Sequence, residues 1–171
     1  MKKLMFLGMI AAMLISCKSN DEVNVLVGNY TYKTSGVVTI NNSPIVSGDV
    51  HLTPETGTLQ LSDTNKENEV VLNFNQSLGD AYDIAAFVTS DSIYLRPMHR
   101  NMDVEVARDT LLSGNVIKHL ETFDVEVSGS GYMLKNGDLC FMLSYKGEQR
   151  NDPKCVVSGT NIHLHCKRNA N

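Results

Sequence analysis

The chain has 171 residues, of which 42% are hydrophobic, and its 15 basic and 19 acidic residues give a formal net charge of −4. This length is typical of one domain with a self-sufficient hydrophobic core. The lysines and arginines form no stripe or cluster along the chain. The composition therefore argues against a nucleic-acid partner.

The first 16 residues have the three-part pattern of a secretory signal peptide. Lys2 and Lys3 give it a basic start, and an uncharged run of apolar and small residues extends from Leu4 to Ile15. Such a run is too short to cross a bilayer as a stable helix. We expect residues 1–16 to be removed from the mature protein.

The apolar run ends in Leu14-Ile15-Ser16-Cys17, which resembles the lipobox of bacterial lipoproteins. The resemblance implies that the signal is cleaved before Cys17, and that this residue carries acyl chains on its sulfur and its new amino terminus. Several acyl chains hold a soluble domain stably on a membrane, since each buried CH₂ group contributes about 0.8 kcal/mol. The membrane is thus the first expected partner. The alternative is an ordinary signal peptide followed by a chance cysteine.

Residues 17–24 are predicted to be the lipidated cysteine and a flexible tether, because Lys18 to Glu22 contain no apolar side chain. This stretch also resembles the short acidic export signal, often begun by lysine, of surface-displayed lipoproteins of the Bacteroidota. The resemblance implies a lipid-anchored protein of the outer membrane, either periplasmic or exposed at the surface. The folded domain is predicted to span residues 25–171.

From Gly28 onward, short segments of alternating apolar and polar residues are separated by Gly, Pro, Asn and Asp. This pattern predicts an all-β domain, an antiparallel meander of about ten short strands. Residues 50–53 and 59–62 are expected to form a hairpin, and Pro97 is expected to end its strand or to lie at an edge. Residues 107–121 are expected to be a loop with one or two helical turns, because Val116, Ile117 and Leu120 have helical spacing.

The end of the chain contains the strongest turn signals. Asn136-Gly137, between two alternating segments, predicts a hairpin with a type I′ turn, since both residues tolerate positive φ. Residues 129–131, Gly-Ser-Gly, predict a bulge or a bend within a strand.

A meander of hairpins closes most simply as an up-and-down barrel. Gly28-Asn29-Tyr30 at the first strand, with Lys167 and Arg168 at the last, resembles the calycin or lipocalin pattern. In that family a Gly-x-Trp motif opens the barrel and its Trp packs against a basic side chain near the end. This chain departs from the pattern because it has no Trp. The resemblance favours a calycin-like β-barrel over a two-sheet β-sandwich.

The barrel interpretation predicts a non-catalytic protein that binds a small, largely apolar ligand inside or at the rim of the barrel. The alternative is a β-sandwich module that contacts a protein or glycan of the envelope through its surface. No nucleophile elbow, phosphate loop or zinc-protease motif occurs, and no cofactor is expected. The candidate ligand-binding residues are the aromatic side chains of Tyr30, Phe74, Phe87, Phe123 and Phe141.

Three cysteines remain after Cys17, and an oxidising compartment permits one disulfide among them. Cys155 follows a polar loop, whereas Cys140 and Cys166 lie within predicted strands. Pairing of Cys155 with either partner is therefore favoured, and the alternative is three unpaired or buried thiols.

Two further kinds of site are weaker. His163 and His165 share a strand face and are candidate metal ligands, although two solvent-facing histidines explain the pattern better. Asp91-Ser92-Ile93 and Asp109-Thr110-Leu111 resemble the O-glycosylation acceptor of the Bacteroidota, which implies possible sugars on Ser92 and Thr110.

Overall fold

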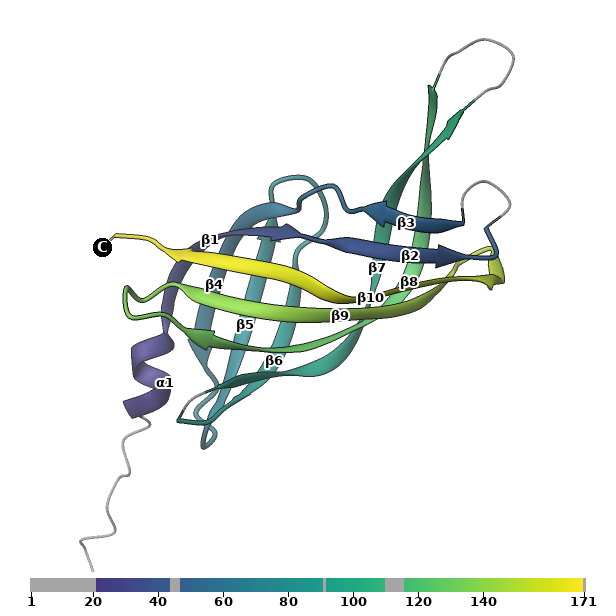
Figure 1. The fold of residues 1–171 in the computed structure, drawn as a ribbon. Helices are drawn as coiled ribbons and strands as arrows, with labels where there is room; N and C mark the ends of the chain where they lie inside the picture. The colour runs from purple at the N-terminus through teal and green to yellow at the C-terminus, as the bar shows by residue number, and fades with distance from the viewer. Residues whose placement is uncertain (1–20, 44–46, 91, 110–115, 171) are drawn as a thin grey trace, which may run out of the picture.

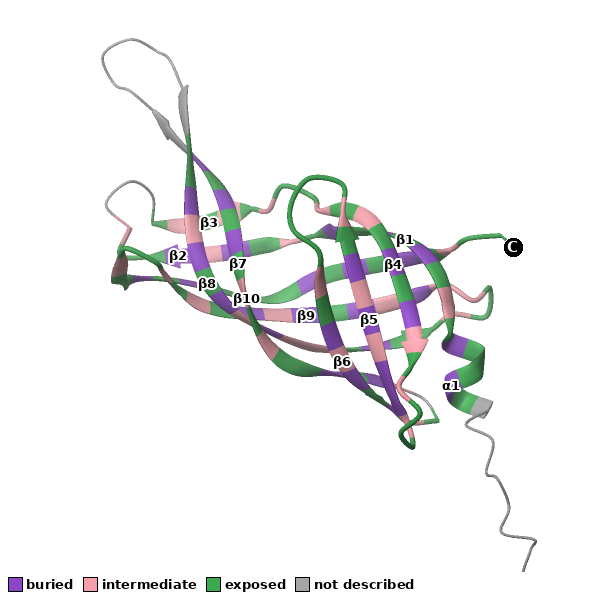
Figure 2. Ribbon diagram, turned by 180° about the vertical axis from the view of Figure 1, so that it is seen from behind, coloured by how far each residue is buried: buried purple, intermediate pink, exposed green. Residues whose placement is uncertain are grey.

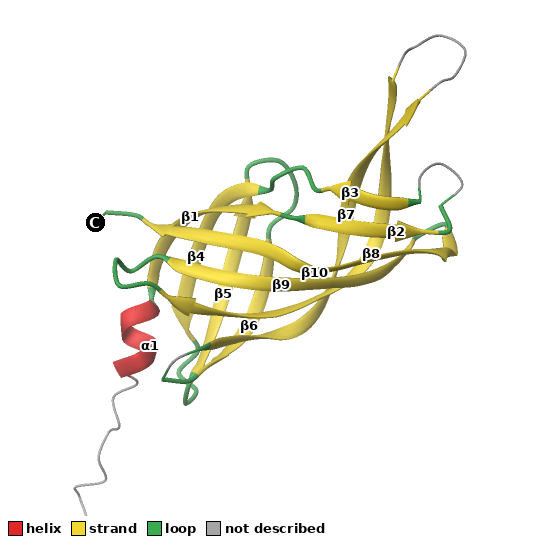
Figure 3. Ribbon diagram, viewed as in Figure 1, coloured by secondary structure: helices red, strands yellow, loops and turns green. Residues whose placement is uncertain are grey.

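The structure is a computed structural model that describes residues 21–43, 47–90, 92–109 and 116–170 (Figure 1). A short helix, α1 (Asp21–Leu26), precedes the strands, and strands dominate the rest of the described chain (Figure 3). The strands are β1 (Gly28–Ser35), β2 (Val37–Asn41), β3 (Gly48–His51), β4 (Thr56–Asp63), β5 (Glu69–Gln76), β6 (Tyr82–Val88), β7 (Ile93–Asp109), β8 (Val116–Met133), β9 (Leu139–Gln149) and β10 (Asp152–Arg168).

These strands form one antiparallel sheet in the order β1-β4-β5-β6-β7-β8-β9-β10-β2-β3, and β1 also pairs with β10. The second pairing closes an eight-stranded barrel from β1 and β4 to β10. The predicted all-β, calycin-like barrel is thus confirmed over the sandwich. Buried and exposed residues alternate along the strands (Figure 2). The buried apolar side chains form one continuous core.

Beyond the barrel, the sheet continues as an open extension. The chain passes from β1 into β2 across Gly36, where a Cβ atom would lie 2.7 Å from Cδ1 of Ile162. β2 then pairs with β10, and β3 pairs with β2. The distal parts of β7 and β8, which pair with each other, also extend beyond the barrel (Figure 1). The predicted hairpin between residues 50–53 and 59–62 is wrong, because β3 pairs with β2 whereas β4 pairs with β1 and β5.

Bulges mark the junction of the barrel and the extension. Leu95 pairs with Gly129 and Met98 with Val127, so two residues of β7, Arg96 and Pro97, face one residue of β8. Pro97 does not end its strand, because the bulge accommodates proline within β7. It does lie at an edge as expected, since the β6–β7 ladder stops at Leu95 and β7 pairs there with β8 only. The bulge lies in β7, whereas the facing glycine segment 129–131 of β8 remains in register with β9.

The region between β7 and β8 differs from its prediction. β7 reaches Asp109 and β8 begins at Val116, and the two strands pair over their whole lengths. The expected helical turns over residues 116–120 are absent from the described residues, because the cross-strand ladder satisfies their backbone groups instead.

At the other end of β8, the predicted hairpin forms, but only Gly137 of the Asn136-Gly137 pair has positive φ (87°). Its N–H donates to the Leu134 carbonyl oxygen at 2.9 Å, so a type I turn with a glycine bulge replaces the expected type I′ turn.

The boundary of the folded domain also shifts. Helix α1 starts at Asp21, within the predicted tether, and Val23 and Leu26 are buried against the barrel end. The i, i+3 spacing of these two side chains places both on one face of the helix. The helix of six residues is too short to span a membrane, and no described helix is long and apolar enough to do so.

Candidate functional site

The barrel has one end covered by α1 and another end, the mouth, where β1, β6 and β9 contribute tyrosines around a buried arginine. The group consists of Tyr32, Glu55, Tyr82, Arg100 and Tyr145, and is called the mouth cluster below. Tyr32 and Tyr145 are buried, and only 9% of the Arg100 side chain is exposed. Charged and phenolic groups thus meet inside an otherwise apolar barrel.

Arg100 points inward because of the bulge in β7. Before the bulge, Ile93 and Leu95 are buried, whereas after it the inward positions are Met98, Arg100 and Met102. One extra residue exchanges the two faces of a strand. Without the bulge at Arg96-Pro97, the guanidinium of Arg100 would face solvent on the outside of the barrel.

Glu55 enters the mouth from the segment between β3 and β4. Its N–H donates to Oγ1 of the buried Thr34 at 2.9 Å, and its carbonyl oxygen accepts from the Thr34 N–H at 2.9 Å. Gln76 Nε2 donates to Glu55 Oε2 at 3.1 Å. The carboxylate is therefore fixed from both its backbone and its side chain.

Arg100 and Glu55 form a two-pronged ion pair. Nη1 of Arg100 donates to Oε2 of Glu55 at 3.2 Å, and Nη2 donates to Oε1. The guanidinium carbon lies 4.5 Å from the centre of the Tyr82 ring, within the range of a cation–π contact. Glu55 is 24% exposed, so the pair lies at the border between the core and solvent.

An aromatic stack continues from the ion pair into the barrel. Phe74 stacks on Tyr82 with ring centres 4.8 Å apart, and Tyr32 meets Phe74 edge-on at 5.1 Å. Both arrangements are the favoured ones for aromatic pairs. The mouth therefore has rigid apolar walls beside its charged groups.

The mouth cluster favours charged arginine and neutral tyrosines. Burial by itself lowers the pKa of Arg100, but Tyr82 and the Glu55 carboxylate outweigh it and raise that pKa above its ordinary value. Burial, followed by the Glu55 carboxylate, raises the pKa of Tyr32 to about 12, although Arg100 opposes this. Burial also raises the pKa of Tyr82 and of Tyr145. At neutral pH the tyrosine hydroxyls are thus available as hydrogen-bond donors.

Two buried hydrogen-bonding atoms of the mouth cluster have no partner among the described residues: Oη of Tyr32 and Nε of Arg100. A buried donor without an acceptor costs about 1–3 kcal/mol. Both atoms can donate to an acceptor that is not part of the chain. Unpaired donors beside aromatic walls are suited to bind a molecule that carries an oxygen or nitrogen acceptor.

At the opposite end, the corresponding tyrosine and arginine donate to backbone carbonyl oxygens. The hydroxyl of Tyr30 donates to the Leu26 carbonyl oxygen at 2.6 Å. Arg168 lies 5.8 Å over the Tyr30 ring and donates to the carbonyl oxygens of Val25 and Val27 at 2.9 and 3.0 Å. This tyrosine–arginine pair occupies the place where the calycin resemblance implies a Trp packed against a basic side chain.

The five aromatic residues predicted to bind a ligand lie in different places. Phe74 contacts the mouth cluster, Tyr30 is at the α1 end, Phe141 is in the barrel wall and Phe123 belongs to the extension, and all four are buried. Phe87 is 42% exposed on the outer face of β6, so its assignment to the interior is wrong. The apolar partner face of that strand consists of Ile84, Ala86 and Val88 instead.

The predicted disulfide is not formed. The three cysteines among the described residues are free thiols. Cys155 and Cys166 lie on the same strand, far apart along β10, and Cys140 pairs with His165 near the Cys166 end. Extended backbone keeps Cys155 beyond the reach of either partner, since a disulfide needs Cα atoms within about 7 Å.

The remaining predicted sites stay predictions. His163 and His165 are exposed on β10, and no group of three or more metal-ligating side chains occurs in the described part of the chain. Ser92 is half-buried, and its carbonyl oxygen accepts from the Thr89 N–H at 2.8 Å and hydroxyl at 3.2 Å. Cys17 and Thr110 lie outside the described residues.

None of the five mouth-cluster residues is among the site residues predicted from the sequence: Tyr32, Glu55, Tyr82, Arg100 and Tyr145. One signal was available for Arg100. The apolar positions are odd at Ile93 and Leu95 but even at Met102, Val104 and Val106, which places a bulge between them and the arginine on the inner face.

No family model matches the chain, and no curated protein matches it.

Proposed function

We propose that the protein is a non-catalytic, lipid-anchored lipoprotein of the bacterial outer membrane that binds a small, largely apolar ligand at the mouth of its barrel. The membrane part of the proposal rests on the lipobox and on the acidic stretch after Cys17. The ligand part rests on the mouth cluster.

The observation that carries the ligand proposal is the pair of unpartnered donors, Tyr32 Oη and Arg100 Nε. A buried ion pair is weak as a stabilising device, because the cost of desolvation offsets much of the attraction between the charges. The ion pair leaves Arg100 Nε as a free donor beside the stacked rings of Phe74 and Tyr82. This arrangement is better explained by recognition of a ligand than by a contribution to stability. Rings of Phe74 and Tyr82 would contact the apolar body of the ligand.

The charge balance indicates the polar group of the ligand. Glu55 already neutralises Arg100 through both carboxylate oxygens. A ligand carboxylate would lie close to the Glu55 carboxylate and be repelled by it. A neutral acceptor, such as a carbonyl, ester or ether oxygen, accepts from the free donors without this repulsion.

The test is native mass spectrometry, with solvent extraction, on the full chain expressed in a bacterial host of the same envelope type. We expect an apolar molecule to co-purify with the wild-type protein and with the Tyr30→Phe variant. The Tyr32→Phe variant should lose most of it, since it lacks one unpartnered donor. Equal recovery from wild-type protein and Tyr32→Phe, or no bound molecule in any sample, would contradict binding at the mouth.

The anchor is tested separately. We expect wild-type cells to incorporate labelled fatty acid into the protein and to retain it with the outer membrane. The Cys17→Ser variant should incorporate none and should no longer fractionate with the lipidated form. Labelling that persists in the variant would exclude Cys17 as the acylated residue.

A further inference from the structure

The outer surface of the barrel carries a concentrated apolar area close to α1. It comprises Phe87, Tyr94, Tyr132 and Met142 on the outer faces of β6 to β9, together with Val25 of α1 and Met133 at the α1 end of β8, and is called the apolar flank below. Tyr132 and Tyr94 are 53% and 50% exposed. Phe87 pairs directly with Tyr94, and Tyr94 and Met142 pair with Ser130 of β8 from its two sides, so the three apolar side chains lie in one row across β6 to β9 with the small Ser130 between Tyr94 and Met142. Contiguous exposed apolar groups of this kind mark a surface that is covered in use.

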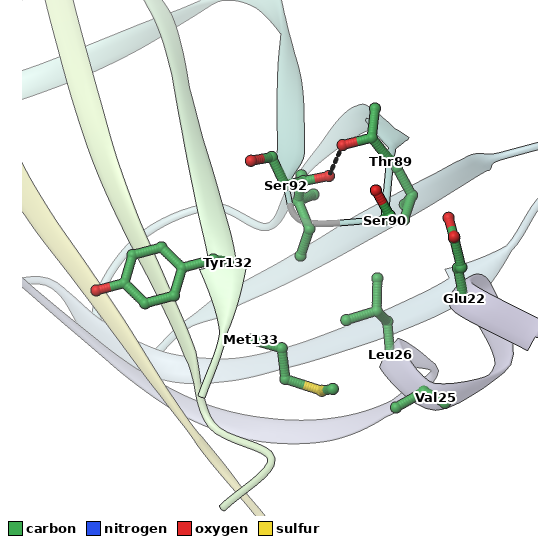
Figure 4. A pocket seen from close by; sticks show the side chains of 10 residues that line it. Glu22, Val25, Leu26, Thr89, Ser90, Ser92, Tyr132 and Met133 are labelled. Carbon is green, nitrogen blue, oxygen red and sulfur yellow. Dashed lines mark hydrogen bonds between the residues drawn. The ribbon is translucent and has the colours of Figure 1, made fainter. Parts of the chain in front are cut away.

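The flank reaches the end of the barrel where α1 lies. A groove there is lined by Val25 and Leu26 of α1, by Thr89 and Ser92 between β6 and β7, and by Tyr132 and Met133 at the end of β8 (Figure 4). Ion pairs from Glu69 to Arg96 at 2.6 Å and to Lys66 at 3.3 Å border the flank beside Phe87. The surface is thus apolar with a charged border.

The length of chain before α1 fixes what can reach this surface. Only three residues separate Cys17 from Asp21, the first residue of α1. Four extended steps span at most about 14 Å. A lipid on Cys17 therefore keeps the α1 end of the barrel close to the bilayer surface.

We propose that the apolar flank lies in the interfacial layer of the membrane, so that the barrel sits on its α1 end and side with the mouth cluster directed away from the bilayer. This inference rests on the proposed lipid anchor. Tyrosine is enriched at membrane interfaces, because its ring is apolar and its hydroxyl stays hydrated. The flank presents two exposed tyrosines with methionine, valine and phenylalanine side chains, which fits this layer better than bulk water.

The absence of Trp from the chain makes a direct test possible, because one introduced Trp is the sole indole fluorophore. Tyr132→Trp and Tyr94→Trp place the reporter in the flank. Leu78→Trp is the matched control, since Leu78 is 94% exposed in the turn between β5 and β6, at the mouth end. Each full-length, lipidated variant is reconstituted into phosphatidylethanolamine–phosphatidylglycerol vesicles with or without brominated acyl chains, and flotation is measured on the same samples.

We expect the two flank reporters to emit at shorter wavelength and to be quenched at least twofold more by brominated lipid than the Leu78→Trp reporter. Equal quenching of all three, or no quenching in vesicles that carry the protein to the top of the gradient, would overturn the flank contact while leaving the anchor intact. A blue shift without quenching would show that a second protein copy covers the flank instead, and would also overturn it. Protein that fails to float would contradict the anchor itself, and the flank contact with it.

Discussion

Each end of the barrel combines a tyrosine of β1 with an arginine of another strand, β10 at the α1 end and β7 at the mouth. At the α1 end, Tyr30 and Arg168 donate to the carbonyl oxygens of Leu26, Val25 and Val27. At the mouth, Tyr32 and Arg100 leave one donor each without a partner, and Arg100 is paired with Glu55. Two neighbouring inward tyrosines of one strand thus have opposite roles.

The difference in hydrogen-bond partners shows that a tyrosine and an arginine can either close one end of a barrel or leave donors there for binding. The carbonyl oxygens at the end of α1 have no partner within the helix, and Arg168 and Tyr30 supply the missing donors. These hydrogen bonds hold α1 at that end of the barrel. No helix among the described residues supplies acceptors at the mouth, so the Tyr32 hydroxyl and Arg100 Nε there keep their donors unpaired.

The largest expected effect comes from breaking the ion pair at the mouth. Arg100→Met removes the cation and leaves Glu55 with its charge in a mostly buried position. Removing one partner of a buried pair costs 3–5 kcal/mol, and the partial exposure of Glu55 places the expected loss of unfolding free energy near the lower end, about 3 kcal/mol. Denaturant unfolding of the variant and the wild type measures it.

The control is the double variant Arg100→Met with Glu55→Gln, in which no charge remains unpaired. We expect it to recover at least half of the lost stability. If Arg100→Met alone is as stable as the wild type, hydration and not the guanidinium stabilises the charge of Glu55.

The next effect separates the two tyrosines. Tyr30→Phe removes the donor to the buried Leu26 carbonyl oxygen and should lower the unfolding free energy by about 1–2 kcal/mol. Tyr32→Phe removes a hydroxyl without a partner, so the ligand-free protein should be unchanged or more stable by up to about 1 kcal/mol. Thermal or denaturant unfolding of both variants checks the difference, and an equal loss in both would contradict the contrast between the two ends.

Much of the barrel was predictable because alternation with period two reports directly on inward and outward faces. The alternating segments of β5, β6 and β9 were predicted on these grounds, and their apolar faces are buried as expected. The partner of β3 was not predictable, since the same alternation suits pairing with β2 or β4. The helical spacing of Val116, Ile117 and Leu120 misled, because long-range pairing with β7 outweighs local propensity.

The mouth cluster was harder to predict for a different reason. Its members come from β1, β6, β7, β9 and the segment before β4, and only the closed topology brings them together. Glu55 lies in a polar stretch that reads as an exposed turn. An aromatic ring does not by itself indicate which face of a strand points inward, and Phe87 lies on the face of β6 opposite to its buried apolar residues.

We expect alkaline pH to lower the free energy of unfolding through the tyrosines of the mouth cluster. The pKa of Tyr32 is raised from 10.0 to about 12, and burial also raises the pKa of Tyr82 and of Tyr145. The unfolded chain therefore releases these protons at lower pH than the folded protein, so stability is complete below pH 10 and falls as the pH rises toward 12. Chemical unfolding between pH 8 and 12 measures the slope, and Tyr32→Phe should reduce it. If unfolding free energy depends on pH in Tyr32→Phe as steeply as in the wild type, Tyr32 does not contribute to the alkaline loss of stability.

Acid pH should act on the α1 end, with the smallest effect. The Asp138 carboxylate accepts from the backbone N–H of Arg168 at 2.9 Å, and this bond, followed in size by the bond from Asn136, holds the pKa of Asp138 below 3.8 against the opposing effect of desolvation. A lowered pKa means that the stabilisation is present above the unfolded-state value and is lost as the pH falls through the folded-state value. We expect Asp138→Asn to flatten the loss of stability below pH 4 while leaving the alkaline slope unchanged. Because Tyr32→Phe should change only the alkaline slope, the two variants together separate the contribution of Tyr32 at alkaline pH from that of Asp138 at acid pH.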